Sequence, residues 1–182
     1  GQFNPTDLKE LLVRVFTNTF ELQDIQYLAD VVDQFKIDLK SLSVQSKTGG
    51  ICTALTFFLS LPTLELKEQY LRLLKKKGVH PDSDVDRPDF IAMDSMTLFM
   101  YCCNKGDRDS VDLLVKYGAD INQVIKAVNK HGVTIFRTPF SVSIGSADID
   151  FVKYLVNQGA NPTKAMNLFN EFSQVCEKAI RI

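Results

Sequence analysis

Two stretches of this chain show the same order of apolar and polar positions. In Thr97 to Gly118 and in Thr138 to Gly159, the closing Gly lies 21 residues after the opening Thr. In the second half of each stretch, apolar residues follow the i, i+3, i+4 spacing of a helix. The positions that we expect to form a buried stripe are Val111, Leu114 and Val115 in the first stretch and Val152, Leu155 and Val156 in the second. A shared length and pattern indicate a repeated structural unit.

Residues at the ends of each pattern predict two short helices joined by a turn. Thr97 and Thr138 precede the first helix, where a Thr side chain caps free N–H groups, and Pro139 suits the first helical turn. Small residues within this helix permit close packing, namely Cys102, Cys103 and Ser143. The residues expected to reverse the chain or end the second helix are Gly106, Ala147-Asp148, Gly118 and Gly159.

Weaker versions of the pattern lie on both sides. A third copy opens at Thr53 and closes at Gly78, with four extra residues near Pro62. Upstream, two helices are predicted at 6–19 and 22–35, the second followed by a turn at 36–38. Residues 163–182 favour a terminal helical hairpin or a cut-off final repeat. Atypical end repeats are expected because they face solvent on one side.

The strongest copies resemble the ankyrin repeat, whose family form opens with T-P-L-H-x-A-A and closes with G-A-D-x-N. Gly118-Ala119-Asp120-Ile121-Asn122 is the most specific match. The resemblance implies an all-α fold, an α-solenoid of four or five helix-turn-helix repeats with divergent caps and extended finger loops. It implies one domain over 1–182. An N-terminal repeat or cap would lie at 6–45 and three repeats at 49–81, 94–122 and 134–162. C-terminal capping helices or a partial repeat would follow at 163–182.

The connections between copies are longer than in the family form. Residues 123–137 contain two β-branched runs around Asn129-Lys130-His131-Gly132, which predict an extended hairpin finger. An extra helical turn in the first half is the alternative. The connection at 82–96 contains Asp82, Asp84, Asp86 and Asp89, and we interpret it as a solvated acidic loop.

In the ankyrin family, the fingers and inner helices contact partners. By that resemblance, the candidate partner-binding residues are Met93, Asp94, Met96, Asn104, Lys105, His131, Ile135, Phe136, Arg137, Gly145 and Ser146. Ile135 and Phe136 either form an exposed apolar anchor or fold back onto the protein. Ser95 and Phe136 stand where the family has a finger Gly. Asn122 is similar to the Asn that asparaginyl hydroxylases modify, and we also expect it to bond backbone groups of the finger.

Composition and motifs argue against other functions. The chain has 21 basic and 22 acidic residues, without the basic excess typical of nucleic-acid binders. The apolar run at 55–61 is too short to cross a membrane. Asp82-Ser83-Asp84-Val85-Asp86 lacks the Gly and Glu of a calcium loop, since Arg87 and Met93 stand there. His80 is expected in a turn, and Cys102-Cys103 in the core as reduced thiols rather than as nucleophiles. We expect no metal or cofactor.

The sequence therefore predicts a non-catalytic, monomeric module that binds a partner protein and is located in the cytoplasm or nucleus. Two alternatives stay open. The domain is a regulatory or substrate-recruiting part of a larger enzyme, channel or ubiquitin-ligase subunit, or it is a bacterial effector that targets host proteins. The fold alone does not distinguish them.

Overall fold

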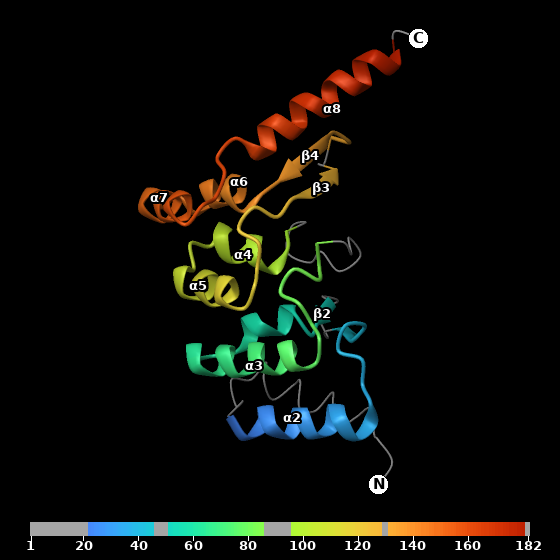
Figure 1. Cartoon of the computed structure of the whole chain (residues 1–182), viewed down its shortest axis with the longest axis vertical. Coiled ribbons are helices and arrows are strands. Elements are labelled where there is room, and N and C mark those ends of the chain that lie inside the picture. The colour runs from blue at the N-terminus through green and yellow to red at the C-terminus, as the bar shows by residue number, and fades with distance from the viewer. Residues whose placement is uncertain (1–21, 46–50, 86–95, 129–130, 181–182) are drawn as a thin grey trace.

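A computed structural model describes residues 22–45, 51–85, 96–128 and 131–180 and shows helices stacked in layers along the long axis (Figure 1). The predicted helix at 6–19 and residues 86–95 lie outside this part of the chain. The elements, in order, are α2 Leu22–Phe35, β1 Ser43–Gln45, β2 Ile51–Thr53, the 3-10 helix η1 Thr56–Ser60, α3 Leu64–Lys76, α4 Leu98–Asn104, α5 Arg108–Lys116, β3 Ile125–Val128, β4 Thr134–Arg137, α6 Pro139–Ser143, the 3-10 helix η3 Ile144–Ser146, α7 Ile149–Asn157 and α8 Lys164–Ile180.

The two strongest sequence copies form two adjacent helical pairs, α4 with α5 and α6 with α7. The inner helices α4 and α6 pack against each other, because Cys103 and Ser143 leave room for close approach and both are fully buried. Thr97 and Thr138 cap these helices as predicted. The Oγ1 of Thr97 accepts a hydrogen bond from Met100 N, and that of Thr138 accepts one from Ser141 N, each at 3.1 Å.

The third copy differs from its prediction at the inner helix. Thr53 ends β2, and its Oγ1 accepts a hydrogen bond from Thr56 N at 3.1 Å, the same i+3 contact as in the other copies. The helix that follows is a short 3-10 helix that stops before Leu61. Because Leu61 precedes Pro62, its backbone is extended, with ψ at 129°, and the helix cannot continue. The predicted helix at 22–35 is confirmed at the same bounds.

The closing glycines have the predicted left-handed backbone. Gly118 and Gly159 both have φ of +105°. The next residue then bonds back into the outer helix, Ala119 N to Leu114 O at 2.9 Å and Ala160 N to Leu155 O at 3.0 Å. A residue with a Cβ would be strained at these positions, which explains why the repeat closes with Gly.

Side chains link each closing turn to the next one along the stack. Asp82 Oδ2 accepts a hydrogen bond from Asp120 N at 2.8 Å. One repeat later, Asn122 Oδ1 accepts from Asn161 N at 2.7 Å, and Asn122 Nδ2 donates to Gly159 O at 2.9 Å. The expectation that Asn122 bonds backbone of the finger is therefore wrong. Its partners belong to the following turn, because the carboxyl end of the closing motif faces the next repeat.

The buried stripe of the outer helices is narrower than predicted. Val111, Leu114 and Leu155 are buried, but Val115 and Val156 are 40% and 39% exposed. Including these two valines in the core was wrong. Each outer helix packs on its inner helix and its neighbours, and nothing in the described residues covers its remaining side.

Residues 125–128 and 134–137 form the two strands of the predicted finger hairpin, and the first of these segments is not a helical turn. β3 and β4 pair antiparallel, with Ala127 opposite Ile135 and Lys126 opposite Phe136. A second antiparallel pair, β1 with β2, ends at Thr53, the opening Thr of the third copy. The fold is therefore helical with two short two-stranded sheets, and not all-α.

The C-terminal region is one helix. Residues 164–180 form the single helix α8, so the predicted terminal hairpin is wrong, whereas a cut-off final repeat stays a prediction. This segment contains no Gly or Pro at which the chain could reverse. α8 contacts β4 along the finger and extends beyond it (Figure 1).

Candidate partner-binding surface

Four of the predicted site residues lie together where the inner helices end. Asn104 at the end of α4 donates from Nδ2 to Val142 O of α6 at 3.1 Å. A Cβ added to Gly145 would lie 2.4 Å from the same Nδ2 atom. Lys105 is exposed, and its amine lies 5.3 Å from the ring centre of Tyr101. We name the set Asn104, Lys105, Gly145 and Ser146 the turn cluster.

The finger hairpin presents two different faces. Successive residues of a strand point to opposite sides, so Ile135 and Arg137 share one face and Phe136 lies on the other. Phe136 meets Phe172 of α8 edge-on, with ring centres 6.0 Å apart, and the Lys126 amine lies 4.7 Å from the Phe172 ring centre. We expected Phe136 either to be an exposed anchor or to fold back onto the protein, and the structure shows that it folds back onto α8. The face with Ile135 and Arg137 is half-buried and turned away from α8.

The remaining predicted residues are separated from these two groups. His131 is exposed at the turn of the hairpin. Met96 is half-buried and packs against the core, so it is no free contact point. Met93 and Asp94 lie outside the described residues. The predicted residues thus form a turn cluster at one end of α4 and α6 and a finger at the other. α4 has seven residues, so this layer is about 10 Å long.

A buried polar network holds the base of the finger. Thr97 Oγ1 donates to Gln123 Oε1 at 2.5 Å, and Gln123 Nε2 donates to Asp82 Oδ1 at 2.8 Å. Gln123 is buried two residues before β3 begins. The network therefore ties the start of the finger to the opening Thr of one repeat and to the preceding connection. Sequence analysis did not identify Gln123, because a single Gln after the closing motif carries no local signal.

Asp84 lies beside this network and is not solvated. Its side chain is 6% exposed, and Oδ2 accepts a hydrogen bond from Leu98 N at 2.8 Å at the start of α4. Oδ1 has no hydrogen-bond partner among the described residues. Burial raises the pKa of this carboxyl from 3.8 to about 6, because the charged form is poorly solvated. The solvated acidic loop expected at 82–96 is wrong at this residue, which caps α4 from the preceding connection.

The paired cysteines occupy the core, as the sequence predicts. Cys102 and Cys103 are both buried in α4. Burial raises the pKa of Cys102 to about 12 and that of Cys103 well above its usual range. A thiol that stays protonated is a poor nucleophile, so this pair supplies packing rather than chemistry.

The described ranges contain no cluster of three or more His, Cys, Asp or Glu side chains able to hold a metal ion. None of their helices is both long and apolar enough to cross a bilayer.

Comparison with known proteins agrees with the helical pairs. No curated protein matches the chain. The family model described as Ankyrin repeat matches residues 94–126, which contain the capped helix α4, the outer helix α5, the closing turn and the start of the finger. Ankyrin repeats typically serve as interaction modules without catalytic activity. The match covers this one segment of the chain, and the geometry that Thr97, Gly118 and Asn122 adopt in it supports its identification as an ankyrin repeat.

Proposed function

We propose that this protein is an α-solenoid of four or five ankyrin-type repeats that binds a partner protein with its finger and turn cluster. Repeats of this kind form extended surfaces because each helical pair stacks only on its neighbours. Ankyrin repeats suggest protein–protein interaction, and the two adjacent pairs α4–α5 and α6–α7 support such a surface.

The single observation that carries the proposal is the two-faced finger. α8 packs on the face with Phe136, whereas Ile135 and Arg137 stay on the other face. An apolar side chain next to an Arg is suited to a contact site, since such residues contribute much of the binding energy of protein interfaces. The hairpin is already paired and its base is held by Gln123, so binding costs little ordering entropy.

The turn cluster would provide the polar part of the contact. Lys105 is exposed and follows Asn104, which is fixed by its bond to Val142. Gly145 is exposed and adds no side chain, so a partner backbone could approach here. A partner that touches both the finger and the turn cluster would lie across the inner helices.

The test compares matched charge changes on two sides of the molecule. Ile135→Glu and Lys105→Glu alter the proposed surface, whereas Ile149→Glu and Lys153→Glu alter exposed positions of the outer helix α7. We expect the first two variants to lose a captured partner by about tenfold or more, and the α7 variants to retain it. Partner recovery from cell extract is quantified by mass spectrometry, with thermal unfolding as a check on folding.

A result that would sink this proposal is equal partner recovery by all four folded variants. Loss of partner only in the α7 variants would assign binding to the outer helices instead.

A further inference from the structure

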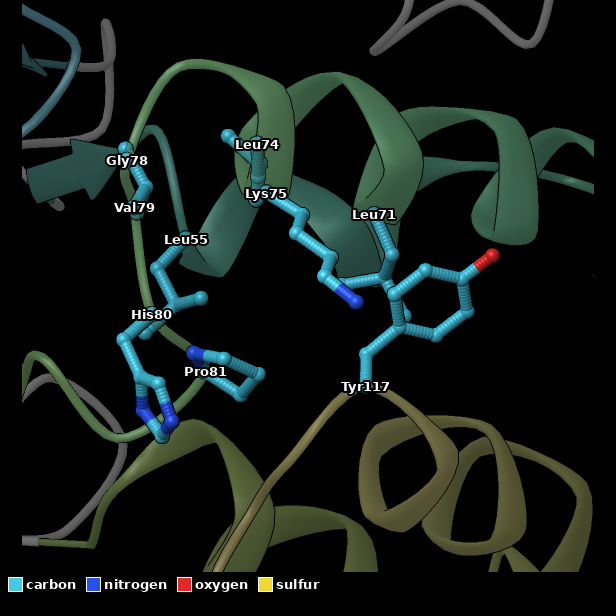
Figure 2. A pocket seen from close by; sticks show the side chains of 9 residues that line it. All are labelled: Leu55, Leu71, Leu74, Lys75, Gly78, Val79, His80, Pro81 and Tyr117. Atoms are coloured by element: carbon cyan, nitrogen blue, oxygen red, sulfur yellow. The ribbon is translucent and has the colours of Figure 1, made fainter.

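A pocket of about 330 Å³ lies between the outer helices α3 and α5 and the closing turn of the third sequence copy (Figure 2). It is lined by Leu55, Leu71, Leu74, Lys75, Gly78, Val79, His80, Pro81 and Tyr117. Leu55, Leu71, Leu74 and Val79 are core residues, so the inner wall is apolar. Small-ligand sites are apolar cavities with a few placed polar groups, and this volume is near their lower limit.

Hydrogen bonds fix two of the pocket walls. The Tyr117 hydroxyl accepts from Arg72 Nε at 3.0 Å and donates to Glu68 Oε1 at 3.2 Å. On the other side, His80 Nδ1 accepts from Asp82 N at 3.0 Å. The His80 ring also lies close to Gly118, where an added Cβ would be 3.3 Å from Nε2. The pocket is therefore preformed, and a ligand need not order its walls.

One positive charge points into this pocket. Figure 2 shows the Lys75 side chain running from α3 toward the Tyr117 ring, with its amine in the opening. No carboxylate of the described residues lies within ion-pair distance of this amine. Glu68, on the same helix, is paired with Lys116 and Arg72. A ligand carboxylate would complete the Lys75 site.

The Lys75 amine and the Tyr117 ring are not part of the pattern that the copies share. Counted back from the closing glycines, Leu74 corresponds to Leu114, and both are buried. Lys75, in contrast, corresponds to Val115, and Tyr117 corresponds to Gln158. The buried Leu is therefore the same in both copies. The Lys75 amine and the Tyr117 ring have no equivalent in the copies with which they were aligned.

We infer that this pocket binds the C-terminal residue of a peptide, with an apolar side chain between Leu71 and Pro81 and the terminal carboxylate paired with Lys75. A C-terminal residue carries both an apolar side chain and a carboxylate. These two groups match an apolar pocket that has a single amine at its opening. Lys75, Gly78 and His80 are exposed at that opening, so the rest of the peptide can leave toward solvent. The site is separate from the finger and the turn cluster.

The test uses the full chain, labelled with ¹⁵N, and the acetylated peptide Gly-Ser-Gly-Leu with a free C-terminal carboxylate. Saturable shifts of the Gly78, Val79 and Tyr117 amide signals are expected, with weak affinity near ~1 mM for so small a ligand. Three comparison ligands are the same peptide amidated, the peptide ending in Ser, and the free acid 4-methylpentanoate. Lys75→Met should weaken binding about fivefold, as expected for an exposed ion pair. Lys76→Met removes the neighbouring exposed charge and should change nothing.

Each other result overturns the inference. Absence of shifts, or equal binding by the amidated peptide or by Lys75→Met, removes the carboxylate contact. Equal binding by the Ser peptide removes the apolar contact. If 4-methylpentanoate binds as tightly as the Leu peptide, the pocket is a site for small acids rather than for the end of a peptide. Since the finger variants do not touch this pocket, failure here leaves the proposed partner surface unaffected.

Discussion

Asn104 and Gly145 approach so closely that a side chain at residue 145 would displace the Asn104 amide. The Asn104 Nδ2 that bonds to Val142 O is the atom that a Cβ on residue 145 would meet at 2.4 Å. Gly145→Ala should therefore displace the Asn104 side chain and break this bond. We expect the free energy of unfolding to fall by about 1 kcal/mol, measured by urea denaturation.

The same substitution in an Asn104→Ala background separates this contact from other effects of Ala. When Asn104 is absent, Gly145→Ala should lower the free energy of unfolding only slightly. An equal loss in both backgrounds would contradict the assigned contact.

Asp84 should make stability depend on pH. Because its pKa is raised from 3.8 to about 6, the folded protein binds a proton that the unfolded chain does not bind between these values. The free energy of unfolding should therefore rise as pH falls from about 6 to about 4. The Asp84→Asn variant has no charge to bury. Its free energy of unfolding should therefore exceed that of wild type by about 1–3 kcal/mol at neutral pH, and this difference should shrink toward pH ~4.

Urea unfolding across this pH range measures the effect. Asp112→Asn, at an exposed position of α5, is the matched control and should follow the wild-type pH dependence. A constant difference between Asp84→Asn and wild type at all pH values would rule out a titrating Asp84.

Asn122 should stabilise the stack through its two bonds to the next closing turn. Asn122→Ala removes the contacts with Gly159 O and Asn161 N, and we expect a loss of about 1–2 kcal/mol in urea unfolding. Asn170→Ala, at an exposed site in α8, should leave stability unchanged or raise it slightly, because Ala favours helix. Equal effects of the two substitutions would mean that the Asn122 bonds contribute nothing.

Phe172 should hold α8 against the finger. Phe172→Ala removes the edge-on contact with Phe136 and the Lys126 amine contact, so amide exchange in α8 should accelerate while exchange in α5 stays unchanged. Phe169→Ala, on the same helix at a 42% exposed position, is the control. Hydrogen–deuterium exchange detected by mass spectrometry distinguishes them. Similar exchange in both variants would show that the ring pair does not anchor the helix.

The cysteines should differ in reactivity. Cys102 and Cys103 are buried with raised pKa values, whereas Cys176 is half-buried in α8. Iodoacetamide near pH ~8 should therefore modify Cys176 well before the α4 pair, because the thiolate is the reactive form. Peptide mapping by mass spectrometry measures the order of labelling. Early modification of Cys102 in folded protein would contradict its assigned position in the core.

The parts of the fold that sequence predicted are those with local causes. Thr97 and Thr138 cap helices through contacts three residues away, and Gly118 adopts a backbone that other residues avoid. The finger hairpin followed from its β-branched runs and turn residues. Each of these features depends on a few adjacent residues, so the sequence contains its complete signal.

The features that were missed or wrong depend on distant partners. Val115 has helical spacing for the core, yet no element covers it. Asp84 looks like a loop residue until Leu98 donates to it. The position of Phe136 required knowing that α8 returns along the finger. For the same reason, sequence analysis selected the turn-cluster residues from equivalent positions of two copies but did not identify the pocket beside Lys75, which joins residues from two copies.

The forward-reaching bonds of Asp82 and Asn122 also determine how this protein would respond to tension. Each bond joins one closing turn to the next, so a force along the long axis would load the Asp82–Asp120 and Asn122–Asn161 contacts in series. The turn with the weaker bonds would open first, while the helices on either side stayed folded. Extension of the molecule would then load these turn bonds together with the packing of α4 on α6.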